Sequence, residues 1–412
     1  MKILHTSDWH LGRRLFGRQR YEEFEAFLDW LAVLIEDAGV DVLVVAGDVF
    51  DTSTPSNRAQ SLYYRFLCRL AGSCCRHVVV VAGNHDSPTF LDAPRELLKV
   101  LDVHVIGAVP DDLADEVLVL HHPETGMAEL VVCAVPYLRD RDIRRVEAGE
   151  SVEDKDRKLI EGIRDHYRTV VELACRRRAE LDGHPPMLAT GHLFTAGGRT
   201  MDGDGVRDLY VGSLAHVGRD IFPDGLDYVA LGHLHVAQTV QGSERVRYSG
   251  SPLPMGFGEA GQRKSVCLVE LEAGGSLLTV RCPEVPVFQP LARVRGDWEA
   301  IQARLRELVA ADSRAWLEVI YEGEAVIGDL RARLDEILAG SRLEVLRLKN
   351  ARVIDRVLAQ CHDRETLDDL DVHDVFERCL TRHEVPDTQR PSLRLAYRET
   401  VAALHDADPL AE

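Results

Sequence analysis

The chain lacks the features that mark secreted, disulfide-bonded and membrane-spanning proteins. Its nine cysteines are an odd number, they are scattered, and no two of them form a C-x-x-C pair. This pattern argues against a disulfide framework and a zinc ribbon, and it favours a reducing cytoplasm. No apolar stretch approaches the roughly 20 residues that a membrane helix needs. The chain enters a predicted strand directly after Met1, so we expect no signal peptide.

An excess of basic charge is also missing. The 49 lysines and arginines face 68 aspartates and glutamates, which gives a net charge of −19. A protein that holds DNA by itself usually carries a basic stripe that displaces counterions from the phosphates. The acidity therefore disfavours unaided binding of nucleic acid. It leaves open local basic patches, metal ions that face the phosphate, or a partner that holds the DNA.

What the chain has is length and a regular alternation of strand and helix patterns. Its 412 residues, 45% hydrophobic and 28% charged, are typical of a soluble globular protein with two or three domains. Short, nearly all-apolar runs predict strands that are covered on both faces, and amphipathic segments between them predict helices. The first part should therefore be a layered α/β domain. The predicted strands are Lys2–Thr6, Val42–Ala46, Val78–Ala82, Leu130–Ala134, Met187–Thr190 and Tyr228–Leu231, then Arg247–Gly250 and Ser265–Leu271 in a second sheet; the predicted helices are Tyr21–Ala38, Ala59–Ala71 and Lys155–Asp182.

A proline-rich stretch, Cys282–Pro290, predicts a domain boundary. Beyond the small module that follows it, Val372–His383 and Gln389–His405 are amphipathic and are separated by Pro386. These two segments could form a helical lid on the module or dock onto another protein. The module itself is predicted to run strand Leu291–Arg295, helix Trp298–Ala310, strand Trp316–Tyr321, helix Ile327–Leu338 and strand Glu344–Lys349. We expect domains over residues 1–282, 283–352 and 353–412.

Five apolar runs end in a small residue followed by side chains that bind metals. The candidate metal ligands are Asp8, His10, Asp48, Asn84, His192, His233 and His235. In open α/β sheets ligands bind beyond the carboxyl ends of the strands, so these distant loops can converge on one place. Asp8 and His10 are two residues apart, and in an extended segment both side chains can lie on the same side. Glycines at 47, 83, 191 and 232 let the backbone turn sharply there.

The ligand set predicts the chemistry of the site. Carboxylate, carboxamide and imidazole without thiolate suit manganese, iron or zinc rather than an all-oxygen magnesium cage. Asp48 could bridge two cations about 3.5–4 Å apart, which would bind phosphate oxygens and lower the pKa of a trapped water. His85 is the candidate for protonating the leaving oxygen, and Asp51 could orient its ring and favour its protonated form. Five other histidines are predicted to be structural or surface residues: His5, His77, His104, His121 and His122.

Together with their neighbours, these motifs resemble the calcineurin-like metallophosphoesterases, and among them the bacterial nuclease subunits of DNA repair complexes. The similarity runs over nearly the whole chain and is strongest before residue 270. The segments that carry it are Ile3–Gly12, Val45–Asp51, Ala82–Ser87, Ala230–His235 and Tyr248–Pro254.

The resemblance implies a fold and a set of site residues. The fold is a four-layer α/β/β/α sandwich with a small α/β capping domain and a C-terminal helical segment that binds a partner. The first metal would be held by Asp8, His10, Asp48 and His235. The second would be held by Asp48, Asn84, His192 and His233, with His85 as the catalytic histidine. The implied cofactors are two manganese ions, with iron or magnesium as substitutes, and no organic cofactor.

The resemblance also implies an activity and a setting. It implies ATP-dependent 3′-to-5′ exonuclease action on double-stranded DNA and endonuclease action on single strands and hairpins, in DNA repair, recombination and replication. The implied partner is an SMC-family ATPase that would supply the grip on DNA, with a homodimer of this chain inside a heterotetramer. The location would be the cytoplasm, near the nucleoid and without a membrane.

Two other functions stay open at this point. The first is a phosphatase or phosphodiesterase of the same superfamily acting on a substrate other than DNA. Protein phosphatases tend to continue the second motif with Asp-Arg-Gly, whereas here Asp51 is followed by Thr52 and Ser53. The second is a scaffold that docks an ATPase and has lost catalysis. The complete ligand set and His85 argue against it.

Three further features allow two interpretations each. Four arginines after the first ligand pair could contact phosphate or could be a solvated helix start: Arg13, Arg14, Arg18 and Arg20. The glycine-rich loop Thr195–Asp208 could line a DNA groove or be a simple connection. Ser249–Pro254 could shape the floor of the site or be a structural turn.

Overall fold

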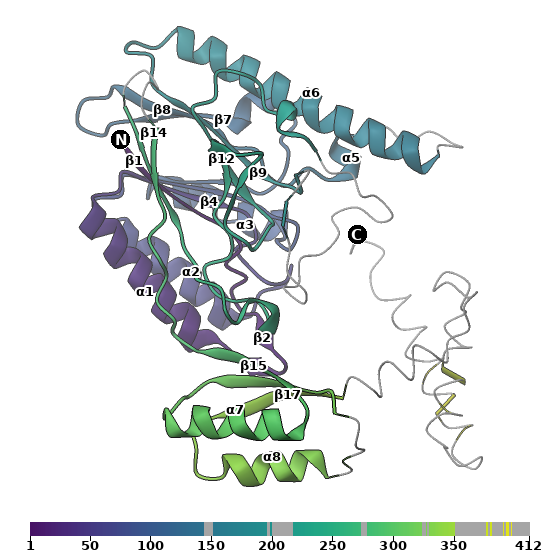
Figure 1. Ribbon diagram of the computed structural model, residues 1–412. Helices are drawn as coiled ribbons and strands as arrows, with labels where there is room; N and C mark the ends of the chain where they lie inside the picture. The colour runs from purple at the N-terminus through teal and green to yellow at the C-terminus, as the bar shows by residue number, and fades with distance from the viewer. Residues whose placement is uncertain are drawn as a thin grey trace. The chain divides into compact units, whose positions relative to one another are not determined.

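The computed structural model describes residues 1–143, 151–195, 198–199, 217–272, 278–323, 327 and 329–350, with isolated residues between 376 and 397. The chain forms two compact units, Met1–Lys349 and Asn350–Glu412. Both large sheets and all predicted site residues lie in the first unit (Figure 1). The division into three domains stays a prediction.

The first sheet has six strands in the order β14-β13-β1-β4-β5-β6. Its parallel part is formed by β1 (Lys2–Thr6), β4 (Val42–Ala46), β5 (His77–Val81) and β6 (Val103–Ile106). The strands β13 (Cys267–Leu271) and β14 (Leu278–Arg281) extend it antiparallel. Placing Ser265–Leu271 in a second sheet was therefore wrong. The strand β13 belongs to the first sheet because its pairing with β1 buries Val269 and Leu271 in the same core as Ile3.

The long helices α1 (Tyr21–Ala38) and α2 (Asn57–Leu70) cover one face of this sheet, and the short helices α3 (Pro88–Asp92) and α4 (Arg95–Lys99) add Leu91 and Leu98 to the same core. Helix α1 buries Phe24, Phe27 and Leu31, which recur at helical spacing, and ends at Gly39 in the left-handed conformation. Each such buried side chain contributes about 1.5–3 kcal/mol of hydrophobic stabilisation. Helix α2 starts two residues before its predicted beginning because the Ser56 hydroxyl accepts the backbone N–H of Ala59.

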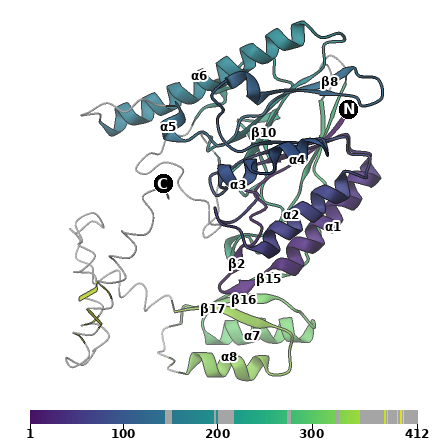
Figure 2. The ribbon, with the colours of Figure 1, turned by 180° about the vertical axis from the view of Figure 1, so that it is seen from behind.

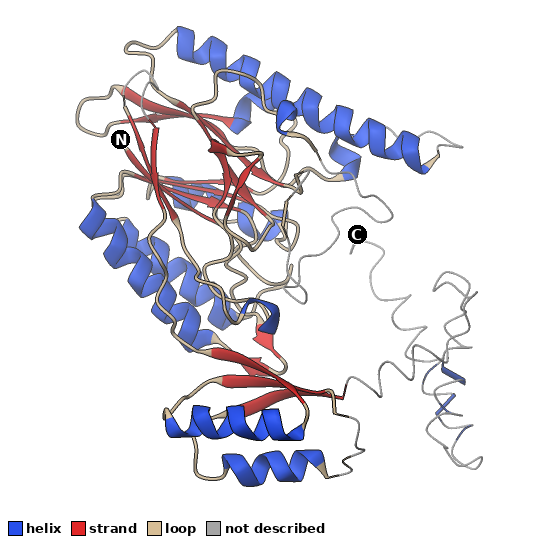
Figure 3. Ribbon diagram, viewed as in Figure 1, coloured by secondary structure: helices blue, strands red, loops and turns tan. Residues whose placement is uncertain are grey.

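The second sheet also has six strands, in the order β11-β12-β10-β9-β8-β7. One helix, α6 (Val152–Ala179), packs on it through residues such as Tyr167 and Val170. Figures 1, 2 and 3 show the two sheets facing each other, with α1 and α2 outside one and α6 outside the other. The strands are β7 (Val117–His121), β8 (Ala128–Cys133), β9 (Met187–His192), β10 (Tyr228–Gly232), β11 (Gln238–Val240) and β12 (Ser243–Tyr248).

A shared core between the sheets explains why the strands are almost wholly apolar. In β4, Val42 and Val44 face this inter-sheet core, while Leu43 and Val45 face α1 and α2. Both faces are buried, as the apolar runs predict. The strands that precede the predicted ligands are therefore held by packing on both faces.

The module after the proline-rich stretch is a three-stranded sheet with two helices on one face. The sequence of strand, helix, strand, helix and strand is confirmed, except that the second helix begins at Leu330 rather than Ile327. The elements are β15 (Leu291–Gly296), α7 (Trp298–Ala310), β16 (Trp316–Tyr321), α8 (Leu330–Leu338) and β17 (Glu344–Asn350).

The two predicted C-terminal helices lie mostly outside the described residues, as does most of the loop Thr195–Asp208. Within the second unit, the Phe376 and Tyr397 rings stack with centroids 4.0 Å apart, and Arg394 Nη2 donates to Glu377 Oε2 at 2.8 Å. Across the described part of the chain, no helix combines the length and apolar character that crossing a membrane requires.

Candidate metal centre

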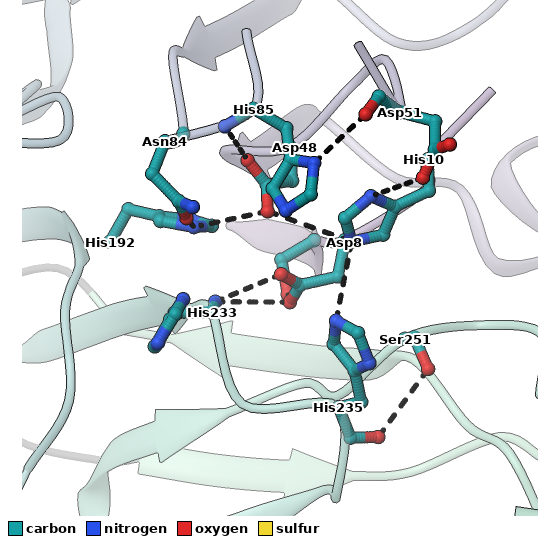
Figure 4. A network of polar contacts seen from close by, with 12 residues as sticks. Asp8, His10, Asp48, Asp51, Asn84, His85, His192, His233, His235 and Ser251 are labelled. Atoms are coloured by element: carbon teal, nitrogen blue, oxygen red, sulfur yellow. Dashed lines mark hydrogen bonds and ion pairs between the residues drawn. The ribbon is translucent and has the colours of Figure 1, made fainter. Parts of the chain in front are cut away.

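The seven predicted ligands meet where the parallel strands of both sheets end (Figure 4). The first sheet contributes residues after β1, β4 and β5, and the second contributes residues at the ends of β9 and β10. Six of the seven are almost completely buried: Asp8, His10, Asp48, His192, His233 and His235. The convergence that the strand-end pattern predicts is therefore present.

The backbone reaches this arrangement through left-handed residues. Four ligand positions have positive φ angles: Asp8 at 53°, His10 at 48°, Asp48 at 52° and His233 at 96°. The expectation of an extended segment at Asp8 and His10 was therefore wrong. Left-handed residues other than glycine cost of order 1–3 kcal/mol each and persist where the surrounding structure enforces them. Here the N–H groups of Asp8 and His10 donate to the carbonyls of Gly47 and Asp48, both at 3.0 Å.

At two positions only glycine fits, because neighbouring atoms lie too close to the backbone for a Cβ atom. Gly47 has a φ of 89°, and a Cβ there would overlap the His192 ring. A Cβ on Gly232 would overlap the carbonyl oxygen of Ala46. These contacts bring the end of β4 against the ends of β9 and β10, which joins the two halves of the site.

The first group of ligand atoms comes from Asp8, His10 and His235 and lies within 4.8 Å of one another. The Nε2 atoms of His10 and His235 face each other at 3.2 Å. Asp8 is held by the Ser7 hydroxyl, which donates to Oδ2, and by the His233 N–H, 2.9 Å from Oδ1. Two imidazole nitrogens and a carboxylate thus converge on one point.

The second group comes from Asp8, Asp48 and His192. His192 Nε2 lies 3.3 Å from Asp48 Oδ2 and 3.0 Å from Asn84 Oδ1. Its Nδ1 lies 3.0 Å from the carbonyl oxygen of Ala46. Because a carbonyl only accepts, Nδ1 is the donor, and Nε2 is left to bind a metal. Asp48 Oδ2 is also 3.5 Å from His10 Nε2. One oxygen of Asp48 therefore lies between the two groups.

The electrostatics keep His10, His233 and Asp48 in the form that binds metals. Burial lowers the pKa of His10, and burial together with the charge of His192 lowers the pKa of His233 well below its usual range. Burial opposes ionisation of Asp48, but His192 and His10 hold its pKa well below the usual value. Burial also lowers the pKa of His192, yet Asp48 outweighs it and raises that pKa to about 9. Metal binding at His192 must therefore displace a proton.

One buried atom has no protein partner where a metal ligand is expected. His233 Nε2 makes no hydrogen bond with the described residues, although it is enclosed between His192 and Phe194. A buried polar atom without a partner costs about 1–3 kcal/mol. A metal ion bound to this nitrogen would remove that cost, so the donor set fits a metal centre.

His85 lies beside both groups and is held at two points. Its backbone N–H donates to Asp48 Oδ1 at 2.9 Å, and its Nδ1 lies 2.8 Å from the backbone carbonyl of Asp51. The carbonyl, rather than the expected carboxylate, makes the contact with the ring. The Asp51 carboxylate instead lies 3.4 Å from His10 Nδ1 and 3.2 Å from Arg13 Nη1. An Nδ1–H donated to the carbonyl leaves Nε2 of His85 for the reacting groups.

Several supporting residues were missed by the sequence reasoning. Asp86 accepts the backbone N–H groups of Val49, Phe50 and Gly83 at 2.9–3.1 Å and so ties the loop after β4 to the loop after β5. Burial and the charge of Asp48 raise the pKa of Asp86 to about 7. Its position directly after His85 was the available signal.

A second supporting network lies behind His235. The Lys264 ammonium donates to the His235 carbonyl and to the Ser251 hydroxyl, both at 3.0 Å, and pairs with Glu259. Glu259 Oε1 in turn lies 3.7 Å from His235 Nδ1. Carboxylates behind a ligating histidine orient its ring. The Ser249 hydroxyl also lies 2.8 Å from the Ser7 hydroxyl, so the segment Ser249–Pro254 borders the site. This agrees with the interpretation that the segment shapes the floor of the site.

The four arginines near the first ligand pair have different surroundings. Arg13 lies beside Asp51. Arg20 is buried, pairs with Glu23 at 2.8 Å and donates to the Pro254 carbonyl, so phosphate contact by Arg20 is excluded. Arg18 pairs with Glu344 of β17, and Arg14 is exposed.

A cavity of about 470 Å³ opens beside His235 and is lined by Arg199, Ser249, Arg263 and Lys264, among others.

Comparisons with known proteins show the family of the chain. Residues 1–237 match the model of the calcineurin-like phosphoesterases, and residues 287–384 match the Type 5 capsule protein repressor C-terminal domain. The first match contains every predicted site residue. Together with the grouped donor atoms, it implies divalent metal ions.

Three curated relatives are named as the SbcD subunit of the nuclease SbcCD. The protein of Escherichia coli (strain K12) is 38% identical over 407 residues, which covers 98% of each chain. That of Rhodobacter capsulatus is 34% identical and covers 85% of this chain and 88% of the relative. That of Bacillus subtilis (strain 168) is 37% identical and covers 66% and 67%. The chain therefore belongs to the calcineurin-like phosphoesterases and, within them, to the family of the SbcD nuclease subunits.

Proposed function

We propose that this chain is the nuclease subunit of an SbcC–SbcD type complex and hydrolyses phosphodiester bonds of DNA with two divalent metal ions. Membership of the family supports the substrate. The observation that carries the reaction is the position of Asp48 Oδ2, which lies 3.5 Å from His10 Nε2 and 3.3 Å from His192 Nε2. A carboxylate oxygen between two sets of donors is what a bridging ligand of a two-metal hydrolase requires.

The donor set fits two ions, and we assign manganese to both, with iron or magnesium as substitutes. The first ion would be held by Asp8, His10, Asp48 and His235. The second would be held by Asp48, Asn84, His192 and His233. When bound, such ions supply Lewis acidity toward the phosphate and lower the pKa of water. Mixed imidazole and oxygen ligands favour manganese or iron over magnesium.

His85 is the proposed proton donor to the leaving oxygen. The Asp51 carbonyl accepts the Nδ1–H of its ring at 2.8 Å, which directs Nε2 toward the reacting groups. The ring packs at 90° to that of His10, with centroids 4.8 Å apart. One oxygen of the Asp51 carboxylate lies within 4.8 Å of a nitrogen of each ring. No organic cofactor is part of the proposal.

The partner and the architecture follow from the rest of the chain. We propose that the sheets and helices of residues 1–282 form a four-layer sandwich, that residues 283–352 cap it, and that residues 353–412 bind an SbcC-like SMC-family ATPase. A net charge of −19 disfavours DNA binding by this chain alone, so it supports an arrangement in which the partner holds the DNA. We also propose that the chain forms a homodimer within a heterotetramer. Its activities would be 3′-to-5′ exonuclease and hairpin endonuclease action. Its role would lie in DNA repair, recombination and replication in the cytoplasm.

A nuclease assay tests the substrate. The purified chain with manganese should degrade linear duplex DNA or nick a DNA hairpin, and it should leave a phosphopeptide intact. Gel electrophoresis of labelled DNA and phosphate release from the peptide measure the two activities. Hydrolysis of the phosphopeptide with DNA untouched under manganese, iron and magnesium would refute the nuclease and favour a phosphatase.

Removing the residues after about 370 tests the partner. The truncated chain should keep its manganese-dependent activity, because every site residue lies before 260. It should lose stimulation by ATP in the presence of the ATPase, since the docking segment is gone. Pull-down of the ATPase and DNA cleavage with and without ATP measure both effects. Unchanged binding of the truncated chain would contradict the docking role.

A further inference from the structure

A second cluster of possible metal ligands lies at the opposite end of the first sheet. It consists of His77, Asp102 and His104, at the start of the neighbouring strands β5 and β6. Strand pairing brings them together: Val78 N donates to the Asp102 carbonyl at 3.0 Å, and Val79 lies opposite His104. A strand rises about 3.3 Å per residue, so His77 lies roughly 20 Å from Asn84, which follows the other end of β5.

The atoms of this cluster are placed as ligands. One donor atom from each of the three residues lies within 4.8 Å of the other two. His77 is only 5% exposed, and its Nδ1 has no hydrogen-bond partner among the described residues. The same is true of His104 Nε2, which is also buried. Two enclosed imidazole nitrogens without partners, next to a carboxylate, form an incomplete arrangement that a cation would complete.

The other nitrogen of His77 has the partners expected behind a metal ligand. Its Nε2 lies 3.1 Å from the His121 carbonyl and 3.3 Å from Glu129 Oε1. Both can only accept, so Nε2 donates to them, which leaves Nδ1 as the nitrogen available to a metal. Glu129 is fixed in turn by Arg76, whose Nε and Nη2 donate to its two oxygens at 3.1 and 2.6 Å. A carboxylate and a carbonyl behind a histidine are the usual supports of a ligating ring.

Charges of both signs surround the cluster. Three carboxylates lie near it: Asp102 in the cluster, and Asp41 and Glu129 on either side of Arg76. Arg95, Lys99 and Arg177 line the cavity beside His104, together with Asp115. The geometry of the three ligands, rather than the net charge, therefore favours a cation here.

We propose that His77, Asp102 and His104 form a separate site for a divalent transition metal, best suited to zinc, with water completing a tetrahedral shell. Two imidazoles and one carboxylate are a common zinc ligand set. The site does not depend on the proposed nuclease function, and the separation of roughly 20 Å between His77 and Asn84 excludes a part in catalysis. Its role is structural: it ties β5 to β6 and, through the His121 carbonyl and Glu129, to β7 and β8 of the second sheet.

Zinc content tests this site. The full chain, stripped by chelation, is loaded with zinc, passed through gel filtration and analysed by mass spectrometry. Because imidazole and carboxylate ligands of the other metal centre can also bind zinc, the zinc content of each variant is compared with that of the unchanged chain. His104→Ala and Asp102→Asn should each bind one zinc ion fewer than the unchanged chain, and Glu129→Gln should bind it about 10–100-fold more weakly. His184→Asn, at an exposed histidine, is the matched control and should bind as the unchanged chain does.

Equal zinc content in the unchanged chain, His104→Ala and Asp102→Asn would overturn the proposal. Crystals of the unchanged chain soaked in zinc and measured at the zinc absorption edge give an answer that needs no variant. An anomalous peak about 2.0–2.1 Å from His77 Nδ1 and His104 Nε2 is expected. A map with zinc at Asp48 and none at His77 would also overturn it.

Discussion

Replacing His85 with glutamine is expected to lower the rate constant of DNA cleavage by about 10²–10⁴-fold while manganese binding is retained. Only the ring is lost in this variant. The backbone N–H of residue 85, which donates to Asp48 Oδ1, stays in place. The ligands therefore keep their positions, and only the proposed proton donor to the leaving oxygen is missing. Single-turnover cleavage of duplex DNA at saturating manganese measures the rate, and mass spectrometry measures the bound metal.

The control for this experiment is His122→Gln, at a partly exposed histidine that lies outside both metal clusters. It should cleave DNA at the original rate. An unchanged rate in His85→Gln would exclude the ring as proton donor. Loss of manganese from His85→Gln would instead assign the ring to the metal shell, which would contradict its proposed role.

Replacing Asp48 with asparagine is expected to have the larger effect, because it removes the ligand that we propose both ions share. Changing a residue that merely supports a ligand costs about 10–100-fold in metal affinity. We therefore expect the affinity for each of the two manganese ions to fall by more than about 100-fold, and cleavage to become undetectable. Isothermal titration with manganese measures the affinity. The same substitution removes the charge that raises the pKa of His192 to about 9.

Two controls separate this loss from misfolding. Asp29→Asn changes an exposed carboxylate that pairs with Arg69 on the surface, and it should leave both manganese affinities unchanged. Thermal unfolding without metal should show that Asp48→Asn is still folded, since it keeps the size of the side chain. Two manganese ions bound to the folded variant with the original affinity would contradict the bridging role.

The sequence predicted the strands that carry the site because their signal is local. Both faces of β4 are buried, so Val42–Ala46 is recognisable as an apolar run without any knowledge of its neighbours. The partner of a strand is not encoded in this way. Ser265–Leu271 was placed in the wrong sheet because its pairing with Lys2–Thr6 joins residues more than 260 positions apart. The short strand Val103–Ile106 was missed, since four residues give little periodicity.

The ligands of the candidate site were predictable because their signal is also local. The residues that hold these ligands in place were not predictable. A histidine or aspartate directly after an apolar run is visible in the sequence, as at Asp48 and His192. The contact of Lys264 with the His235 carbonyl exists only in the folded chain. The left-handed conformation of Asp8 was also not predictable, because a residue other than glycine adopts it only when tertiary contacts enforce it. His77 and His104 were predicted to be structural or surface residues because neither follows an apolar run in the way that the predicted ligands do.

The position of manganese in crystals of the full chain tests the central claim most directly. Data collected near the manganese edge should show two anomalous peaks about 3.5–4 Å apart, one on each side of Asp48. The first should contact Asp8, His10 and His235, and the second should contact Asn84, His192 and His233. A single peak, or two peaks that do not share Asp48, would contradict the two-metal account.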